Sequence, residues 1–387
     1  MIPSDLKSEL IDLIQTLVRT PSVNPPAETT ACARLVAARL AEHGIGAEIV
    51  EGRKGAANVI ARLAGRGRGR TLLLNGHLDV VQPGEGWTVD PFGGEIKDGR
   101  IYGRGACDMK AGLTALVVAL AAFKRTAAHF NGELVFTAVA DEETGSEFGT
   151  RYLLENNIIP KADCAIVAEP TNLKVELGNR GLRWIDLYVK GKTAHASRPY
   201  LGINAVAYAA RITTAIQAMK FDKRDEAFEI PHPTAAVTMI KGGLQANVIP
   251  NECQLTIDRR MLPGETAPAI VAEISRTVEP ILAEENGLGL EIKVRPNHWD
   301  PYIISPNEPI VQAAVDSLKE VIGKTFPLLG KAACTDASHL FNLGGIPTIL
   351  LGPGDARMAH QVDEYAAMDD IAAAAEVFLS IFNKVLG

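Results

Sequence analysis

The 387-residue sequence predicts an α/β protein with a mixed, largely parallel sheet, helices on both faces, and an inserted ferredoxin-like α+β domain. Three observations lead to this fold class. Short apolar runs alternate with helical patterns over residues 1–179. The patterns over 180–295 follow the order β-α-β-β-α-β, and α/β alternation returns after residue 296. We therefore expect a discontinuous domain of residues 1–179 and 296–387 and an inserted lid domain of residues 180–295.

In the first segment, apolar positions three and four residues apart predict helices over 4–19, 28–43, 109–124 and 147–156. Apolar runs of strand length predict strands over 58–64, 71–75, 133–140 and 163–168. Alternation of strands and helices is typical of a sheet covered by helices on both faces.

The pattern changes near GNRG (178–181), where RWIDLYVKG alternates apolar and polar residues like a half-exposed antiparallel strand. The inserted segment then predicts a helix over 202–219, strands over 234–241 and 252–260, a helix over 266–285 and a strand over 289–295. The last segment predicts a helix over 309–322, a strand over 346–351 and a helix over 369–386. An inserted domain of this kind commonly forms a lid over a cleft.

The composition excludes several classes of protein. With 47% apolar and 22% charged residues the chain is globular rather than disordered. The one basic cluster, RLAGRGRGR (62–70), contains no aromatic residue, so we expect no nucleic-acid partner. The longest apolar run, 111–123, is short for a membrane span, so we expect no membrane partner. Five cysteines without a C-x-x-C pair, and no signal peptide, indicate free thiols and a cytoplasmic location.

Polar side chains follow the predicted strands where each strand ends. A lone acidic triplet such as 141–143 is usually a solvated turn. Here, however, imidazoles and carboxylates follow several strands, and ligands of parallel sheets bind beyond the carboxyl ends. These candidates are His77, Asp79, Asp108, Glu142, Glu143, Glu169 and His360.

Histidine and carboxylate ligands suit zinc, cobalt or manganese, and the lack of a cysteine cluster argues against a structural zinc site. Two histidines and three carboxylates are too many for one catalytic zinc, but they suit two metals that share a carboxylate. Two divalent cations, three carboxylates and one bridging hydroxide would together be neutral. Such a pair could hold the hydroxide and polarise a carbonyl group.

Four motifs resemble a known family: NGHLDVVQPGEGWTVDPFGGEIKDGRIYGRGACDMKAG, ADEETGSEFGT, AEPT and AHQVDEY. In this order they resemble the dinuclear-zinc M20 metallopeptidases and amidohydrolases. This group includes acetylornithine deacetylase, succinyl-diaminopimelate desuccinylase, aminoacylase and glutamate carboxypeptidase. The resemblance covers nearly the whole chain and implies a zinc-peptidase-like catalytic domain.

The resemblance also implies roles for the candidate residues. One metal would be held by His77, Asp108 and Glu169, and the other by His360, Glu143 and Asp108. A hydroxide shared by the two metals would be the nucleophile. Glu142 would act as general base, and Asp79 would orient the imidazole of His77.

In the lid, the resemblance gives His195 of GKTAHASRPYLGINA a hydrogen bond to the oxyanion, often from the neighbouring subunit of a homodimer formed through the lid. Asn247 and Arg260 would bind substrate, with Arg260 gripping a carboxylate, although both could instead be part of the lid structure. Gly352, with Gly354, would let backbone N–H groups approach the substrate.

For some residues the sequence predicts no catalytic or metal-binding role. His339 is expected to be structural, Asp141 is unassigned, and the roles of Asp336 and Ser338 stay open. The function expected is metal-dependent hydrolysis of the amide bond of an N-acyl-L-amino acid with a free carboxylate. The alternatives are a dipeptidase or carboxypeptidase, a non-catalytic binding protein, or a metal-free enzyme with a carboxylate pair such as a glycosidase.

Overall fold

The chain forms two compact units in the computed structural model, which describes residues 2–127 and 129–387. The large unit consists of Met1–Asn179, Ile303–Lys331 and Thr335–Gly387, and the small unit of Arg180–Tyr302 and Ala332–Cys334. The boundary after residue 302 differs from the expected one after residue 295. The reason is that strand β14 (Gly289–Trp299) continues in the sheet of the small unit, where Trp299 pairs with Leu182.

The large unit is built on a mixed sheet of nine strands in the order β1-β2-β6-β3-β7-β17-β8-β15, with β16 beside β8. Its centre, from β6 through β3 and β7 to β17, is parallel, which confirms the predicted fold class. The strands are β1 Ala47–Arg53, β2 Ala56–Ala64, β3 Gly67–His77, β6 Asn131–Val139, β7 Cys164–Val167, β8 Glu176–Asn179, β15 Tyr302–Ile303, β16 Leu329–Lys331 and β17 Thr348–Leu350.

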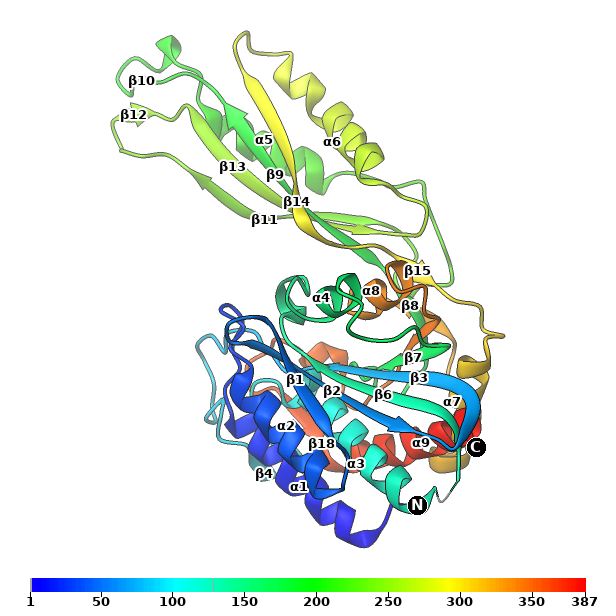
Figure 1. Cartoon of the computed structure of the whole chain (residues 1–387). Coiled ribbons are helices and arrows are strands. Elements are labelled where there is room, and N and C mark those ends of the chain that lie inside the picture. The colour runs from blue at the N-terminus through cyan, green and yellow to red at the C-terminus, as the bar shows by residue number, and fades with distance from the viewer. Residues whose placement is uncertain (1, 128) are drawn as a thin grey trace. The chain divides into compact units, whose positions relative to one another are not determined.

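Helices cover both faces of this sheet. In Figure 1, α1, α3 and α9 lie on one side, and the short α4 and α8 lie on the other. The helices of the unit are α1 Ser4–Arg19, α2 Thr30–Glu42, α3 Ala111–Thr126, α4 Thr150–Glu155, α7 Pro309–Ile322, α8 Ala337–Asn342 and α9 Met368–Leu386. A small sheet joins β4 Glu95–Lys97, β5 Arg100–Tyr102 and β18 Tyr365–Ala367.

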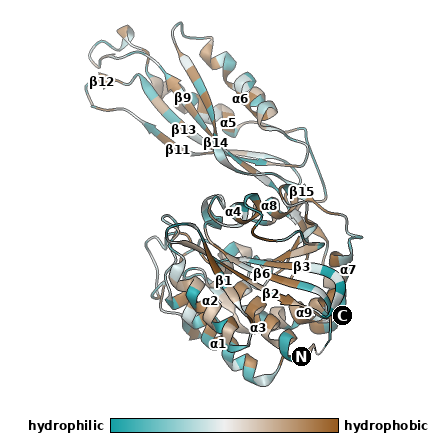
Figure 2. Cartoon of the chain, viewed as in Figure 1, coloured by the Kyte–Doolittle hydropathy of each residue, from teal (hydrophilic) through white to brown (hydrophobic). Residues whose placement is uncertain are grey.

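Helix α3 is the centre of the core, because every residue from Ala111 to Phe123 is buried. Figure 2 shows the same apolar character in the inner parts of β3 and β6, whereas the first residues of β3 are hydrophilic. By length and composition, the stretch Ala106–Thr126 could also cross a membrane, but 94% of its apolar window is buried inside the structure. A helix that is apolar on all sides and enclosed in this way is typical of a protein core.

The pairing register brings the carboxyl ends of the parallel strands to one edge of the sheet. His77, the last residue of β3, pairs with Val139, the last residue of β6. Val167, the last residue of β7, pairs with Asn75 on one side and with Leu350 of β17 on the other. Residues that follow these four strands therefore meet beyond the same edge, where open α/β sheets bind their ligands.

The small unit is a four-stranded antiparallel sheet in the order β11-β13-β9-β14, with β-α-β-β-α-β connectivity. Leu187, Ile212, Leu255 and Ile274 form part of its core. A two-stranded ribbon and a single 3₁₀ turn, Pro199–Leu201, complete it. The remaining elements are β9 Gly181–Lys190, β10 Ala194–His195, α5 Ala205–Gln217, β11 Thr234–Gly242, β12 Val248–Ile249, β13 Glu252–Met261 and α6 Ala267–Leu282.

Candidate metal centre

Two groups of imidazole and carboxylate side chains lie beyond the carboxyl edge of the large sheet. His77 ends β3, Glu143 lies in the one-turn helix Glu142–Thr144 after β6, and Glu169 follows β7 by two residues. Asp108 lies in the turn Ala106–Lys110 that leads into α3, and His360 follows the turn Ala356–Met358.

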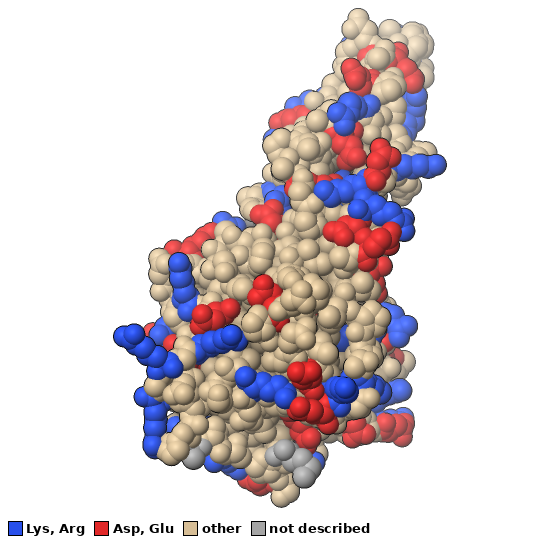
Figure 3. Space-filling view, turned by 90° about the vertical axis from the view of Figure 1, so that its right-hand side faces the viewer, with Lys and Arg blue, Asp and Glu red and all other residues tan. Residues whose placement is uncertain are grey.

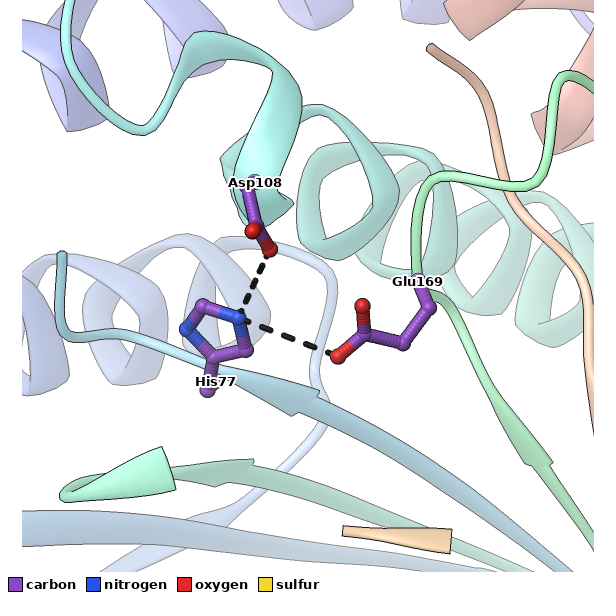
Figure 4. A group of neighbouring side chains, drawn as sticks. All are labelled: His77, Asp108 and Glu169. Atoms are coloured by element: carbon purple, nitrogen blue, oxygen red, sulfur yellow. Dashed lines mark hydrogen bonds and ion pairs between the residues drawn. The ribbon is translucent and has the colours of Figure 1, made fainter. Parts of the chain in front are cut away.

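The first group is His77, Asp108 and Glu169, whose ligand atoms all lie within 4.8 Å of one another. Nε2 of His77 lies 3.1 Å from Oδ1 of Asp108 and 3.9 Å from Oε1 of Glu169. Figure 4 shows the two carboxylates pointing at the same edge of the imidazole ring. All three side chains are largely removed from water, so the group is an enclosed cage.

The second group is Asp108, Glu143 and His360. Nε2 of His360 lies 3.1 Å from Oε2 of Glu143 and 3.4 Å from Oδ2 of Asp108. Asp108 thus offers Oδ1 to the first group and Oδ2 to the second. A carboxylate with one oxygen in each group has the arrangement of a bridging ligand.

Asp79 forms hydrogen bonds with a ligand of each group, His77 and Glu143. The Nδ1 of His77 lies 2.9 Å from the backbone oxygen of Asp79, so it donates there and leaves Nε2 free of its proton to bind a metal. The carboxylate of Asp79 accepts the backbone N–H groups of Glu142 and Glu143, each at 3.2 Å. Asn24 donates to the same carboxylate at 2.8 Å.

Glu142 is buried beside the two groups, with its residue only 8% exposed. Burial raises the pKa of Glu142 well above its usual value, and the negative charges of Glu169 and Asp336 raise it further. A carboxyl group with a raised pKa is suited to accept and return a proton near neutral pH.

The other groups of the cluster also have shifted pKa values. Burial and the charge of Asp108 raise the pKa of Glu169 to about 8. Hydrogen bonds to Asp108 and Glu143 raise the pKa of His360 to about 10. Burial favours a neutral His77, but Asp108 and Glu142 outweigh burial and raise its pKa well above the usual value. The raised pKa values mean that these groups bind protons more tightly, which reduces the repulsion among the neighbouring carboxylates.

The residues present fit two divalent metal ions. The distances of 3.1–3.9 Å between ligand atoms are close to the roughly 3.3 Å edge of a tetrahedron with metal–ligand bonds of about 2.0–2.1 Å. Nitrogen and oxygen donors without a cysteine ligand are the set expected for zinc, cobalt or manganese in a catalytic site. Cations would also take the place of the protons that the cluster otherwise holds.

Close backbone approaches fix the position of Glu169. A Cβ on Gly112 of α3 would lie 1.9 Å from the carbonyl oxygen of Ala168, and a Cβ on Gly352 would lie 2.4 Å from it. The N–H of Gly352 donates to the hydroxyl of Thr171 at 3.1 Å. Gly352 therefore packs against the ligand-bearing segment and binds Thr171 through its N–H, and the substrate contact expected from the sequence stays a prediction.

Several buried polar residues around the site were not singled out from the sequence. Asn24 also donates to Asp141, which is itself part of the turn after β6. Lys331 donates to the carbonyl oxygen of Pro170 at 2.7 Å, directly after Glu169. The sequence shows Lys331 but not its burial, and its spacing from the acids does not show which of them it contacts.

Asp336 is also buried and accepts hydrogen bonds from the hydroxyls of Ser146 and Thr150, the latter at 2.6 Å. Burial raises its pKa to about 6. Asp336 therefore ties α8 to the segment that carries Glu142. Ser338 and His339, left open or structural from the sequence, are buried in α8.

In the small unit, His195 and Asn247 lie side by side on the ribbon of β10 and β12. His195 pairs with Val248, and the backbone N–H of Ala196 donates to the backbone oxygen of Asn247 at 2.9 Å. Nδ1 of His195 accepts the backbone N–H of Ser197 at 3.1 Å. The neutral ring therefore carries its proton on Nε2, which is available as a donor.

Arg260 lies near the last residue of β13. Its Nε donates to Asp258 at 2.7 Å, and Nη1 lies 3.6 Å from the sulfur of Cys334. Arg180 lies close to Arg260. Burial lowers the pKa of Arg180 to about 10, with a smaller contribution from the positive charge of Arg260. Two neighbouring guanidinium groups are a favourable place for a substrate carboxylate.

Comparison with known proteins identifies the family. Residues 73–384 match the model of "Peptidase family M20/M25/M40". The chain belongs to this family. It is 31% identical over 384 residues to succinyl-diaminopimelate desuccinylase of Wolinella succinogenes, with 97% of this chain and 99% of that protein covered. It is 33% identical over 374 residues to acetylornithine deacetylase of Edwardsiella ictaluri, with 93% and 94% covered.

Solved structures of the M20 family share the fold. A tripeptidase of Staphylococcus aureus superposes with a TM-score of 0.83 at 25% identity, covering 100% of this chain and 99% of the other. A dinuclear metal-binding M20 peptidase of Bacillus subtilis superposes with a TM-score of 0.74 at 17% identity, with 98% of each chain covered. The M20 resemblance predicted from the motifs is therefore confirmed, and the chain is a metal-dependent hydrolase of amide bonds.

Proposed function

We propose that this M20 enzyme removes the acyl group from an N-acyl-L-amino acid by hydrolysis of its amide bond. The observation that carries the proposal is the pair of ligand groups joined by Asp108, with Glu142 buried beside them. The names of the relatives, a desuccinylase and a deacetylase, support N-deacylation as the reaction type.

The proposed cofactors are two divalent metal ions, most simply zinc, with cobalt or manganese as alternatives. His77, Asp108 and Glu169 would hold one ion, and His360, Glu143 and Asp108 the other. When bound, two such ions lower the pKa of water and polarise a carbonyl group. Asp79 keeps Nε2 of His77 free for its ion through the contact of Nδ1 with the Asp79 backbone oxygen.

Glu142 is the proposed general base. Its backbone is fixed by the hydrogen bond to Asp79, and its side chain is enclosed among acids that favour the protonated form. Glu142 can therefore take a proton from the attacking water and hold it until the amine leaves. Bound cations would lower its pKa from the metal-free value, which keeps the base form available near neutral pH.

His195 is the proposed donor to the oxyanion that forms at the amide carbon. The contact between the Ser197 N–H and Nδ1 leaves the Nε2 proton of His195 for this task. Asn247, adjacent on the ribbon, is the proposed polar contact to the substrate. Arg260 and Arg180 are the proposed binding site for the carboxylate of the amino acid.

The positions of these residues support a homodimer. Arg260 and Cys253 are seven residues apart on β13, which corresponds to about 23 Å of strand. Cys253 pairs with Val189 and Gly242 at the end of the sheet from which His195 and Asn247 continue, and Figure 1 shows β10 and β12 at that end. The carboxylate and the amide of one amino acid are only a few bonds apart, so one lid cannot supply both contacts.

A second copy of the chain would therefore provide His195 and Asn247 to the site whose own chain provides Arg260. In this dimer, each subunit would complete the site of the other, as the two-fold symmetry of an isologous pair allows. The exposed side chains of Met239 and Ile240 on the edge strand β11 support the lid as the dimer surface.

The second candidate function is dipeptide or carboxy-terminal peptide hydrolysis. The S. aureus tripeptidase, with its high structural similarity, supports hydrolysis of a peptide bond in general. Arg260 would bind an α-carboxylate in either reaction, so it does not discriminate between them. Acidic and basic side chains are interspersed on the face in Figure 3, which supports a small-molecule substrate rather than nucleic acid. Five free cysteines support the expected cytoplasmic location.

The test is release of free amine by zinc- or cobalt-loaded protein from a panel of N-acetyl, N-succinyl and N-formyl amino acids and dipeptides. A chelated sample is the control. Preference for one acyl group, lost on chelation, is expected. Preference for dipeptides would favour the second function. Absence of turnover on the whole panel, with metal bound, would contradict both and leave a binding role.

A further inference from the structure

A buried ion pair lies directly behind the metal ligands and takes no part in the mechanism given above. Glu364 is fully buried, four residues after His360. Its Oε2 accepts from Nη1 of Arg104 at 2.6 Å and from the Gly105 N–H at 3.1 Å. Its Oε1 accepts the N–H groups of Cys107 at 2.8 Å and Asp108 at 3.0 Å. Four N–H donors thus surround one carboxylate.

Arg104 extends the same network to the second metal group. The residue is only 2% exposed, and its Nη2 donates to the backbone oxygen of Pro83 at 3.2 Å and of His360 at 3.4 Å. Its guanidinium lies 5.1 Å from the centre of the Trp87 ring. One side chain therefore joins the segment after β3, the turn before α3 and the loop that carries His360.

The two metal groups differ in how they are held. His77 and Glu169 are buried at the ends of strands in the sheet. His360 lies on a loop, its side chain is 51% exposed and its φ is +64°, so packing restrains it little. The contacts of Arg104 and Glu364 fix the backbone of His360 and of Asp108, two ligands that lie on turns or loops rather than at a strand end.

We propose that Arg104 and Glu364 are a positioning pair that sets the affinity of the second metal, the one shared by Asp108, Glu143 and His360. This inference rests on the proposed metal site. Neither residue touches the ligand positions of a metal. Their effect passes through the backbone N–H of Asp108 and the backbone oxygen of His360.

The chemistry of the pair makes it sensitive to an isosteric change. All four groups that face Glu364 are donors, so Glu364→Gln turns an amide NH₂ toward N–H groups and leaves at least one buried donor unpaired. Arg104→Lys keeps the charge but loses the planar fork that reaches Glu364, Pro83 and His360 together. Both variants should shift the segment with Asp108 and His360 and leave His77 and Glu169 in place.

The experiment is equilibrium dialysis of metal-free protein against zinc alone, with bound metal measured by elemental analysis. Wild type, Glu364→Gln and Arg104→Lys are compared with the control Thr29→Val. Thr29 is a buried side chain of the large unit that exchanges two hydrogen bonds with Ala57 and contacts none of the five ligands. Melting temperatures are measured on the same samples, so that general loss of stability is separated from loss of metal.

Because the first zinc shares only Asp108 with the second and keeps His77 and Glu169, Glu364→Gln should weaken the first zinc less than the second. We expect the second zinc to bind about 10- to 100-fold more weakly, the usual effect of removing a partner of a metal ligand. Arg104→Lys should weaken the same ion to a smaller degree, and it serves as the test if Glu364→Gln does not fold. Thr29→Val should keep both ions. Two ions bound with unchanged affinity by both variants would overturn the proposal, as would equal weakening of both ions. A wild-type chain that binds no zinc would instead contradict the proposed function itself.

Discussion

At the scale of single residues, buried polar groups from distant parts of the chain hold the segments that carry the ligands. His77, Asp108, Glu143, Glu169 and His360 could be named because they follow strands or a helix start in a recognisable order. Asn24, Arg104, Glu364 and Lys331 could not, because each acts through contacts with residues far away in the sequence. For Gly352 the sequence predicts a substrate contact, and the structure adds a hydrogen bond from its N–H to Thr171.

The role of Glu142 gives the first prediction. Glu142→Gln should lower kcat by about 10²–10⁴-fold, the usual contribution of a general base. The variant should still bind two metals. A raised pKa means that the buried Glu142 carboxylate destabilises the folded metal-free protein as pH rises above its ordinary value of 4.5. The metal-free variant should therefore melt at the same or a higher temperature at pH 7. Near-normal turnover in steady-state kinetics would refute the assignment.

The shifted pKa values of the ligands give a second prediction. Without metal, His360 and Glu169 hold protons at pH 7, since their pKa values are raised to about 10 and about 8. Metal binding requires the deprotonated forms, so loading should release about two protons per chain, and metal affinity should fall as pH falls from 8 to 6. Calorimetric titration with zinc in two buffers of different ionisation enthalpy measures this number. A heat of binding that is independent of the buffer would contradict it.

At the scale of elements, the strongly periodic or fully apolar segments were predicted well. Helix α1 has the predicted bounds, and α3, α7, β6, β7 and β13 lie within a few residues of them. The strand β1 (Ala47–Arg53) was missed because its AEIVEGR sequence is polar and lies at an edge of the sheet. The glycine-rich residues 65–70 were left between the predicted strands 58–64 and 71–75, yet β3 begins among them at Gly67, because pairing with β6 overrides the local preference.

The close contact of α3 with the end of β7 gives a third prediction. Gly112→Ala places a Cβ 1.9 Å from the oxygen of Ala168, next to Glu169. Alanine normally stabilises a helix relative to glycine by about 1 kcal/mol, but here overpacking should cost about 1–3 kcal/mol of unfolding free energy. Urea denaturation checks the sign.

The matched control is Gly46→Ala, since a Cβ at Gly46 meets no atom within 4 Å. That variant should change the free energy of unfolding little. Because the Gly112 clash displaces the segment of Glu169, Gly112→Ala should also bind zinc more weakly. Equal stability of the two variants would show that α3 moves away from β7 without cost.

At the scale of the whole molecule, the sequence predicted two domains with an insertion, and the boundary after residue 302 follows from the length of β14. Sequence alone left open whether His195 serves its own chain or a partner. The length of the lid sheet between Arg260 and the β10–β12 ribbon favours the partner. Such a distance depends on strand register, which no motif records.

This arrangement gives a fourth prediction, a complementation between inactive variants. His195→Ala and Glu142→Gln proteins should each be nearly inactive. If a second copy supplies His195, random exchange of subunits should restore about one quarter of the wild-type sites, since half of the dimers are mixed and each has one intact site. Amine release is measured after mixing and re-equilibration of the dimers. No recovery, with mixed dimers demonstrated by mass spectrometry, would mean that His195 acts within its own chain.

The central claim is that the cluster around Asp108 holds two metal ions and uses them to cleave an amide bond. Its most direct test is titration of chelated, metal-free protein with zinc, with bound metal per chain and amine release from the preferred substrate followed on the same samples. The account predicts no turnover without metal and full turnover as binding saturates at two ions per chain. Turnover that persists in exhaustively chelated protein would contradict it. Turnover that reaches its maximum in samples with no bound metal would contradict it as well.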